Sequence, residues 1–188
     1  MEKIYETAYA KINLGLDVLG KRSDGYHEVR MVMQSVGLSD AVEIEEGEGL
    51  VVETDHSGLA GGPDNLAWKA AELLARCCGK IPNVHIRLNK KIFLAAGLAG
   101  GSSDAAAVMR GLSRLWQLDL TAPELEKLAA ELGSDIPFCI TGGTALAEGR
   151  GEILTELPEA PELLLVLAKP KLEVATGWVY GNFRQQKV

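Results

Sequence analysis

A glycine-rich run at residues 97–104 (GLAGGSSD), followed directly by three alanines, restricts the fold of this chain more than any other segment. Its glycines allow the backbone to approach a ligand closely and to adopt conformations that are closed to other residues. The two serines and the aspartate that follow are residue types that often begin helices. We therefore expect a tight backbone turn that opens a buried, alanine-rich helix.

Backbone N–H groups and the helix dipole at such a helix start favour a bound anion, and phosphate in particular. The run lacks the GK[ST] of a Walker A loop and does not fit GxGxxG. Local chemistry alone therefore leaves two interpretations open. The run is either a phosphate-binding loop or a glycine turn that only precedes a buried helix.

Periodic segments elsewhere predict several strands. Apolar residues at positions 12, 14, 16 and 18 alternate with polar or small ones, which indicates a strand over residues 11–18. The same signals predict further strands at residues 29–38, 41–46, 50–54, 84–88 and 163–168, and two short strands around 149–151.

Helix signals lie between these strands. Asp64 is expected to cap a helix that ends at Cys78, with Gly79 beyond it. Residues 121–124 (TAPE) form a capping box for a helix that stops at Gly133, and a short apolar turn is expected soon afterwards. Because strands and helices do not alternate as regular βαβ units, the pattern favours an α+β fold.

The bulk properties exclude some classes of partner. A net charge of −7 without a Lys/Arg run argues against a nucleic-acid or anionic-membrane surface. Residues 163–168 are too few to span a bilayer, and the N-terminus has no apolar leader. The three cysteines show no CxxC spacing and are expected to fill the core in a reducing cytoplasm. We expect a cytoplasmic protein that binds neither nucleic acid nor membrane.

The glycine run resembles the phosphate loop of the galactokinase, homoserine kinase, mevalonate kinase and phosphomevalonate kinase superfamily. More narrowly, the chain resembles the 4-diphosphocytidyl-2-C-methyl-D-erythritol kinase family in five further segments, which are residues 10–16 (AKINLGL), 21–27 (KRSDGYH), 64–66 (DNL), 133–137 (GSDIP) and 144–153. This resemblance implies the superfamily's α+β N-terminal domain (ribosomal protein S5 domain 2-like) over residues 1–154. Residues 155–188 would begin an incomplete, substrate-side α+β domain.

The resemblance also implies an activity and a set of site residues. ATP and Mg²⁺ would serve as cofactors, and the acceptor would be the 2-hydroxyl of a small molecule that carries a cytidine diphosphate group. Asp135 would take the proton of that hydroxyl, and Lys11 beside it would stabilise negative charge during the transfer. The resemblance identifies no metal ligand. The residues implied in ATP binding are Asn65, Leu66, Ala96, Gly97, Leu98, Ala99, Gly100, Gly101, Ser102 and Ser103.

Substrate-binding roles follow from the same resemblance. Tyr26 and His27 would hold the cytosine by stacking and by hydrogen bonds, and Tyr180 would supply a second ring. Asn13 would contact the substrate near the transferred phosphate, and Thr176 would approach the erythritol end.

Each of the main residues also has a plainer interpretation. Asp135 could simply begin a helix, Lys11 could lie on a solvated strand face, and Tyr26 and His27 could form an exposed hairpin tip. Their occurrence together with the glycine run favours the catalytic interpretation.

Two departures from the family pattern limit the expectation. Residues 92–94 lack the usual proline, and the sequence ends at Val188, before the family's third, C-terminal glycine-rich loop. Two alternatives therefore stay open, another small-molecule kinase of the superfamily or a nucleotide-binding fragment without turnover. An incomplete second domain would expose apolar surface and favour self-association.

Overall fold

The structure, a computed structural model, describes residues 3–172, 174 and 176–183. Within this part of the chain, one mixed sheet contains six strands. They are β1 (Lys3–Lys21), β2 (His27–Glu46), β3 (Leu50–Thr54), β4 (Val84–Asn89), β5 (Thr144–Glu148) and β6 (Ile153–Glu156). The helices are α1 (Leu66–Cys78), α2 (Gly100–Leu115), α3 (Ala122–Ala129), α4 (Ile136–Thr141) and α5 (Thr176–Asn182).

The long strand β2 organises the sheet. β1 runs antiparallel along one edge of β2 for almost its whole length. The other edge is shared, because β5 pairs with residues 31–34 and β4 pairs with residues 41–46. β3 extends the sheet parallel to β4, and β6 extends it antiparallel to β5. The mixture of strands and helices confirms the α+β expectation.

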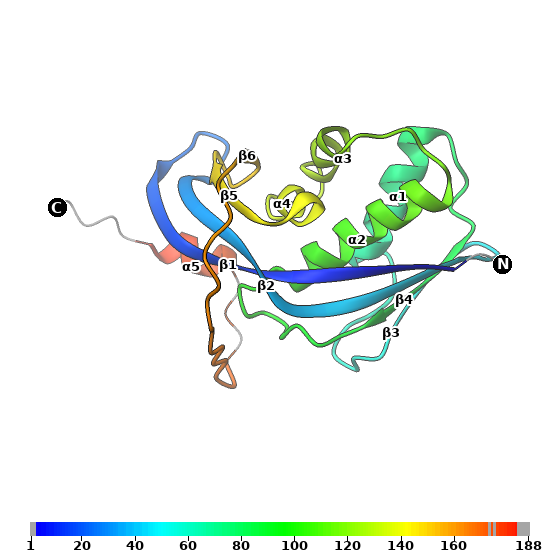
Figure 1. Cartoon of the computed structure of the whole chain (residues 1–188), viewed down its shortest axis with the longest axis horizontal. Helices are drawn as coiled ribbons and strands as arrows, with labels where there is room; N and C mark the ends of the chain where they lie inside the picture. The colour runs from blue at the N-terminus through cyan, green and yellow to red at the C-terminus, as the bar shows by residue number, and fades with distance from the viewer. Residues whose placement is uncertain (1–2, 173, 175, 184–188) are drawn as a thin grey trace.

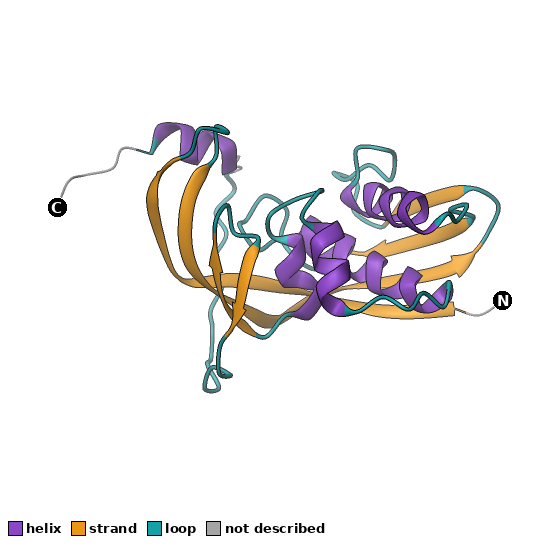
Figure 2. Cartoon of the chain, turned by 90° about the horizontal axis from the view of Figure 1, so that it is seen from above, coloured by secondary structure: helices purple, strands orange, loops and turns teal. Residues whose placement is uncertain are grey.

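Helices α1 to α4 cover one face of the sheet, while α5 lies apart near the hairpin end of β1 and β2 (Figure 1 and Figure 2). α2 is the central helix and is buried along most of its length. Its alanines and Gly111 let it approach the sheet closely, because a Cβ on Gly111 would lie only 2.5 Å from Cδ1 of Ile44. This core holds α2, whose first turn includes the end of the glycine run, against β1 and β2.

Several predicted boundaries need correction. The strands expected at residues 29–38 and 41–46 are one strand, because the intervening Asp40 is buried and accepts hydrogen bonds from the backbone of Lys91 and Ile92. The cap of α1 is Asn65 rather than Asp64, since the Asn65 side chain accepts from the Ala67 N–H at 2.9 Å.

The predicted helix boundaries agree with the structure only in part. α2 begins at Gly100, so the serines expected to cap it lie inside its first turn. The expected apolar turn after residue 137 is the short helix α4. The capping box of Thr121 and Glu124 at the start of α3 is confirmed.

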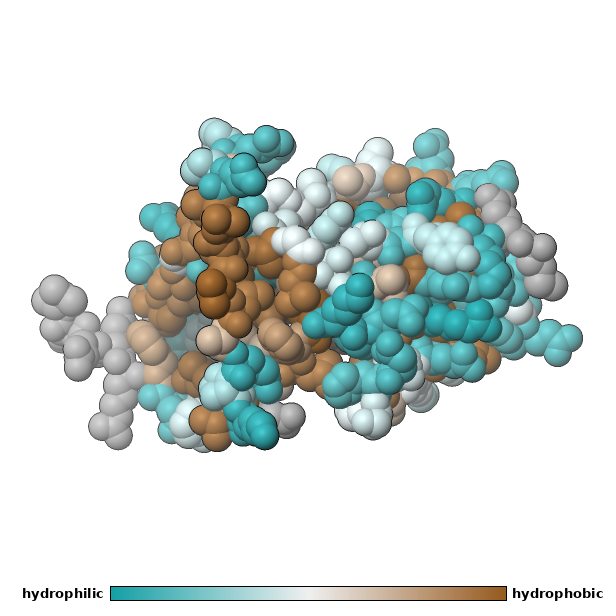
Figure 3. Space-filling model, turned by 60° about the horizontal axis from the view of Figure 1, so that its bottom comes forward, coloured by the Kyte–Doolittle hydropathy of each residue, from teal (hydrophilic) through white to brown (hydrophobic). Residues whose placement is uncertain are grey.

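The strand predicted at residues 163–168 was wrong. Leu164 and Val166 are 99% and 95% exposed, and this segment joins no strand among the described residues. An apolar run becomes a buried strand only when a neighbour satisfies its backbone groups, and here none does. The segment instead crosses the outside of the molecule below the sheet and contributes to a hydrophobic surface (Figure 1 and Figure 3).

The domain boundary expected after residue 154 falls inside β6, which pairs with β5. The division into two domains therefore stays a prediction. None of the helices in the described ranges is both long and apolar enough to cross a bilayer.

Candidate active site

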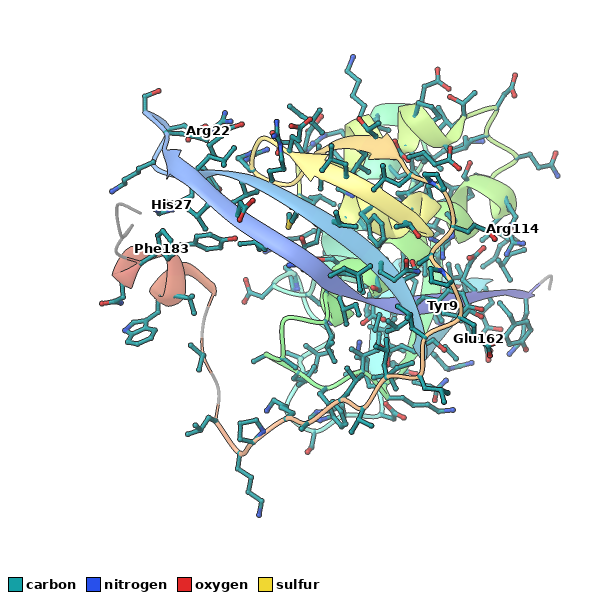
Figure 4. The ribbon with its side chains drawn as sticks, turned by 60° about the vertical axis from the view of Figure 1, so that its left-hand side comes forward. Tyr9, Arg22, His27, Arg114, Glu162 and Phe183 are labelled. Carbon is teal, nitrogen blue, oxygen red and sulfur yellow. The ribbon has the colours of Figure 1, made fainter. Side chains whose placement is uncertain are left out.

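A cavity of about 760 Å³ lies between the hairpin end of β1 and β2, the starts of α2 and α4, and α5. It brings together side chains that the sequence places far apart. The predicted site residues that line it are Lys11, Asn13, Tyr26, His27, Gly97, Ser102, Asp135 and Tyr180. Figure 4 shows one end of this region, where His27 on the hairpin lies near Phe183 at the end of α5.

The inward position of Lys11 results from an irregularity in β1. Burial alternates along the strand as far as Ala10, and then Ala10 and Lys11 are both buried. The pairing with β2 shifts register between Tyr9 and Lys11 at this point. A β-bulge re-aims the side chains that follow it. Lys11 is therefore only 5% exposed and is not on a solvated strand face.

Lys11 and Asp135 meet in the cavity. The Lys11 Nζ lies 3.8 Å from Oδ2 of Asp135 and donates a hydrogen bond of 3.2 Å to Oδ1 of Asn13. Asp135 occupies the N-cap position of α4 but makes no side-chain cap bond, so its carboxylate is free to face the cavity. The pair offers a proton acceptor beside a fixed positive charge, the two groups that transfer to a hydroxyl requires.

The glycine run forms the adjoining wall. The Lys11 N–H donates to the Leu98 carbonyl at 3.1 Å, which ties the run to β1. Ala99 adopts a left-handed conformation with φ of 56°, and the first backbone bond of α2 runs from the Ser103 N–H to the Ala99 carbonyl. The N–H groups before Ser103 have no acceptor within the helix, as at any helix start. These donors suit an anion bound against the glycine run.

The two serines of the run have different surroundings. Ser102 is half-buried and lines the cavity. Ser103 is 1% exposed, and its hydroxyl donates to the Tyr9 carbonyl at 2.6 Å. The Ser103 side chain therefore holds α2 against β1, and its hydroxyl is already bonded within the protein.

Ser103 belongs to a series of contacts along the free edge of β1. Arg110 donates to the Thr7 carbonyl at 3.0 Å, and Arg114 donates to the Tyr5 carbonyl at 3.2 Å. With the bonds at Tyr9 and Lys11, alternate residues 5, 7, 9 and 11 of this edge each bond to α2 or its preceding loop. The position of α2 is thus fixed relative to Lys11.

The other predicted ATP-binding residues lie near the start of α2 but outside the cavity. The Asn65 side chain caps α1 and also donates to the Ala60 carbonyl at 2.8 Å. Leu66 Cδ1 lies 3.5 Å from where a Cβ on Gly101 would be, so α1 and α2 begin side by side. Leu98 is buried in a small core cluster, and Ala96 lines a neighbouring apolar cavity of about 580 Å³.

Aromatic side chains form the opposite end of the cavity. The rings of His27 and Tyr180 stack with centroids 5.2 Å apart, and Phe183 meets His27 edge-on at 6.5 Å. Burial raises the pKa of the Tyr180 hydroxyl, and the Asp135 carboxylate raises it further. Tyr26 is 53% exposed, as expected of a hairpin tip, yet it also lines the cavity. Thr176 begins α5, but its side chain lies outside the described residues.

Two cations of the cavity were missed in the sequence. Arg150 lines the cavity with its Cζ atom 4.9 Å from the centroid of the Tyr26 ring, and Lys21 lies at the end of β1. The sequence does contain a signal for Arg150, because a cation between two glycines indicates a tight turn. In the structure Gly149 and Gly151 have φ of 73° and 114°. A turn that presents a cation to a cavity suits an anionic ligand.

Comparisons with known proteins agree with this geometry. Residues 65–143 match the family described as GHMP kinases N terminal domain. A 4-diphosphocytidyl-2-C-methyl-D-erythritol kinase of Acetivibrio thermocellus is 49% identical over 189 residues, which cover 100% of this chain and 67% of the relative. One of a Synechococcus species is 52% identical over 182 residues, 96% of this chain and 59% of the relative.

Solved structures point the same way. A crystal structure of 4-(cytidine 5'-diphospho)-2C-methyl-D-erythritol kinase has a TM-score of 0.78 and 36% identity, over 96% of this chain and 65% of that one. A homoserine kinase of Cytophaga hutchinsonii, at 19% identity, shares the fold with a TM-score of 0.71 over 100% of this chain and 62% of its own. The chain thus spans about three fifths to two thirds of the length of these curated relatives.

Proposed function

Because the chain belongs to the 4-diphosphocytidyl-2-C-methyl-D-erythritol kinase family within the GHMP kinases, we propose that it transfers the γ-phosphoryl group of ATP to the 2-hydroxyl of that cytidyl compound. This reaction is a step in non-mevalonate isoprenoid precursor synthesis. One observation carries the proposal. A single cavity joins the Lys11–Asp135 pair to the glycine run on one side and to the His27–Tyr180 stack on the other.

In this proposal the phosphates of ATP lie against the N–H groups at the start of α2. The acceptor hydroxyl loses its proton to the Asp135 carboxylate while its oxygen bonds to the γ-phosphorus. The bond from that phosphorus to the oxygen bridging to the β-phosphate breaks, and ADP leaves. The Lys11 ammonium stabilises the negative charge that spreads over the transferred group, so positioning and electrostatics do most of the work.

Mg²⁺ is part of the proposal as the usual companion of ATP. Among residues 3–172, 174 and 176–183, no three His, Cys, Asp or Glu side chains gather into a metal-binding group. Mg²⁺ in kinases is held by only one or two carboxylates together with substrate phosphates. The donors present therefore fit a metal that is carried mainly by the nucleotide, and it would neutralise phosphate charge during transfer.

The cationic and aromatic end would take the cytidine diphosphate group. Arg150 and Lys21 supply positive charge for the diphosphate. The rings of Tyr26, His27 and Tyr180 supply stacking surfaces, and the His27 imidazole can bond to the edge of the base. Asn13, bonded to Lys11, would contact the substrate between these two ends.

The direct test is ADP release by the 188-residue chain given ATP, Mg²⁺ and the diphosphocytidyl substrate. We expect ADP formation that depends on the substrate and is abolished in Asp135→Asn and Lys11→Met, while both variants still bind ADP. Asp119→Asn, the same substitution at an exposed residue, serves as the control and should leave turnover unchanged.

Other outcomes would redirect the proposal. ADP binding without turnover would show a nucleotide-binding unit that lacks parts present in the longer relatives. Turnover with another alcohol, but not with the cytidyl compound, would indicate a different small-molecule kinase of the superfamily. Loss of ADP binding in Lys11→Met would contradict the role given to that residue.

We also propose a cytoplasmic location, in keeping with three cysteines that are all free. Self-association through exposed apolar side chains belongs to the proposal as well. Leu164, Val166 and Trp178 are 99%, 95% and 65% exposed, and such surface is usually covered by protein.

A further inference from the structure

Three charged side chains lie beneath the first turn of α2, almost completely removed from solvent. The Lys90 ammonium donates hydrogen bonds to the carboxylates of Asp40 on β2 and Asp104 on α2. The exposed fractions of these side chains are 1% for Lys90, 0% for Asp40 and 1% for Asp104. With every group ionised, this buried cluster carries one excess negative charge.

The two carboxylates differ in how well they are satisfied. The second oxygen of Asp40 accepts hydrogen bonds from the backbone N–H groups of Lys91 and Ile92. The Oδ1 atom of Asp104 is buried and has no hydrogen-bond partner. An unpaired buried oxygen disfavours the ionised form of a carboxyl group. Burial accordingly raises the pKa of Asp104 to about 7, with Lys90 opposing the rise and Asp40 adding to it.

The cluster lies directly below the proposed phosphate site. The Lys90 Nζ is 3.7 Å from where a Cβ on Gly100, the first residue of α2, would lie. Asp104 is four residues further along the same helix. A polyphosphate on the N–H groups of the helix start would thus be separated from the cluster by the helix backbone alone. Like charges this close repel each other strongly in a medium of low dielectric constant.

We propose that the Asp40–Lys90–Asp104 cluster positions the start of α2 and couples polyphosphate binding there to the uptake of one proton by Asp104. The inference rests on the proposed function, because it requires nucleotide phosphates at the start of α2. The added phosphate charge favours the neutral carboxyl group, which takes its proton from solvent. Asp104 is therefore a positioning residue that acts on the phosphates through the helix start and does not touch them.

The sign of the pH dependence follows from this coupling. The affinity for polyphosphate is highest where Asp104 is protonated and falls as the pH rises through its pKa. In the described part of the chain, the charged groups that contact the Asp104 carboxyl are Lys90, from the loop after β4, and Asp40, from β2. A change in either charge should therefore move the pH at which affinity is lost.

Titration calorimetry of metal-free ADP with the 188-residue chain tests the inference. Runs between about pH 6 and pH 8.5, each in two buffers of different ionisation enthalpy, give both affinity and protons taken up. We expect the affinity for ADP to fall about tenfold over this range. The number of protons taken up on binding should exceed the number that protonation of the ADP phosphates accounts for. In Asp104→Asn the excess uptake should vanish and the fall in affinity should shrink. The exposed control Asp119→Asn should behave like the wild type.

Asp40→Asn distinguishes this coupling from a purely structural role of the cluster, which would not change the pH at which affinity is lost. Its amide oxygen can still accept from the Lys91 and Ile92 N–H groups, but the like charge beside Asp104 is gone. The loss of affinity should therefore shift to lower pH. If Asp104→Asn does not fold, as judged by circular dichroism, this shift and the wild-type uptake decide the matter.

The possible failures are distinguishable. ADP binding without excess proton uptake in the wild type, or without a shift in Asp40→Asn, would overturn the inference and leave the proposed function standing. Failure of the wild type to bind ADP at any pH would overturn both.

Discussion

Lys90 and Lys91 are neighbours in the sequence with opposite surroundings, since Lys90 is buried between two carboxylates and Lys91 is exposed. Removing the cation of this buried cluster leaves Asp40 and Asp104 without a countercharge, and protonation of Asp104 relieves only part of their repulsion. We expect Lys90→Met to lower the free energy of unfolding by about 3–5 kcal/mol. Lys91→Met should change it by less than about 0.5 kcal/mol. Urea unfolding at neutral pH measures both, and equal effects would contradict the burial described for Lys90.

Asp104 should show its raised pKa in the stability of the protein. A carboxyl group whose pKa is higher in the folded state contributes stability below its unfolded value, and that stability is lost as the pH rises through the folded value of about 7. The free energy of unfolding of Asp104→Asn should therefore increase relative to that of the wild type, by about 2–4 kcal/mol, as the pH rises from about 4 to about 8. Unfolding free energies across this range test it, and a constant difference would refute it.

Substitutions at the aromatic end should separate the two ligand sites. Tyr180 contributes a ring to the stack with His27, whereas the N–H groups proposed to hold the phosphates of ATP lie at the start of α2. Tyr180→Leu should therefore weaken binding of CDP by about tenfold and leave ADP binding unchanged. Fluorescence or calorimetric titration with each nucleotide measures this. Equal losses for CDP and ADP would place both nucleotides at one site.

Sequence reasoning found most of the single residues in the cavity but not their orientations. The alternation in β1 placed Lys11 and Asn13 on one face, whereas the bulge that turns Lys11 inward depends on pairing with β2. The Asp40–Lys90–Asp104 cluster could not be predicted, because its members come from three elements and meet only after folding. Arg150 was visible as a cation between glycines, but nothing local showed that it faces the cavity.

The start of α2 stores strain that a glycine could release. Ala99 lies in the left-handed region with φ of 56°, where a Cβ is unfavourable. We expect Ala99→Gly to raise the free energy of unfolding by about 0.5–1 kcal/mol. Ala96→Gly, in the same loop without a positive φ, should lower it by a similar amount through added chain entropy. Stabilisation by both substitutions, or by neither, would contradict the strain assigned to Ala99.

α5 must move if a base is to lie between the ring of its Tyr180 and the ring of His27 on β2. The His27 and Tyr180 centroids are 5.2 Å apart, whereas an intercalated ring needs about 7 Å, twice the usual contact distance. Trp178 on α5 is 65% exposed and can report such a shift. We expect CDP to change the Trp178 emission in a Trp68→Phe, Trp116→Phe background, with ADP as the control. An unchanged spectrum at saturating CDP would show that the base stacks elsewhere.

At the level of whole elements, sequence patterns predicted helix ends correctly where nearby side chains or a glycine determine the backbone conformation. The capping box of α3 and the glycine beyond α1 were both correct. The single long strand β2 was not found, because Asp40 is satisfied by a loop about fifty residues later in the sequence. The strand expected at residues 163–168 failed for the opposite reason, since its apolar pattern has no partner among the described strands.

The outer hydrophobic surface should govern how copies of the molecule interact. Leu164 and Val166 are the most exposed apolar residues of the segment below the sheet. We expect the double variant Leu164→Glu, Val166→Glu to show less concentration-dependent association than the wild type in sedimentation velocity runs. Ile81→Glu, at an apolar residue 75% exposed on a different loop, is the control and should behave like the wild type. Unchanged association in the double variant would exclude this surface.

The contacts between α2 and β1 also determine where the sheet can grow. Along the free edge of β1, the carbonyls of Tyr5, Thr7 and Tyr9 already accept hydrogen bonds from Arg114, Arg110 and Ser103. An incoming strand would have to displace all three donors, so the part of this edge from Tyr5 to Tyr9 is closed to β-augmentation by peptides and to amyloid-like stacking. Strand addition is thereby directed away from the N-terminal half of the strand that carries Lys11, and β3 and β6 form the edges at the far side of the sheet.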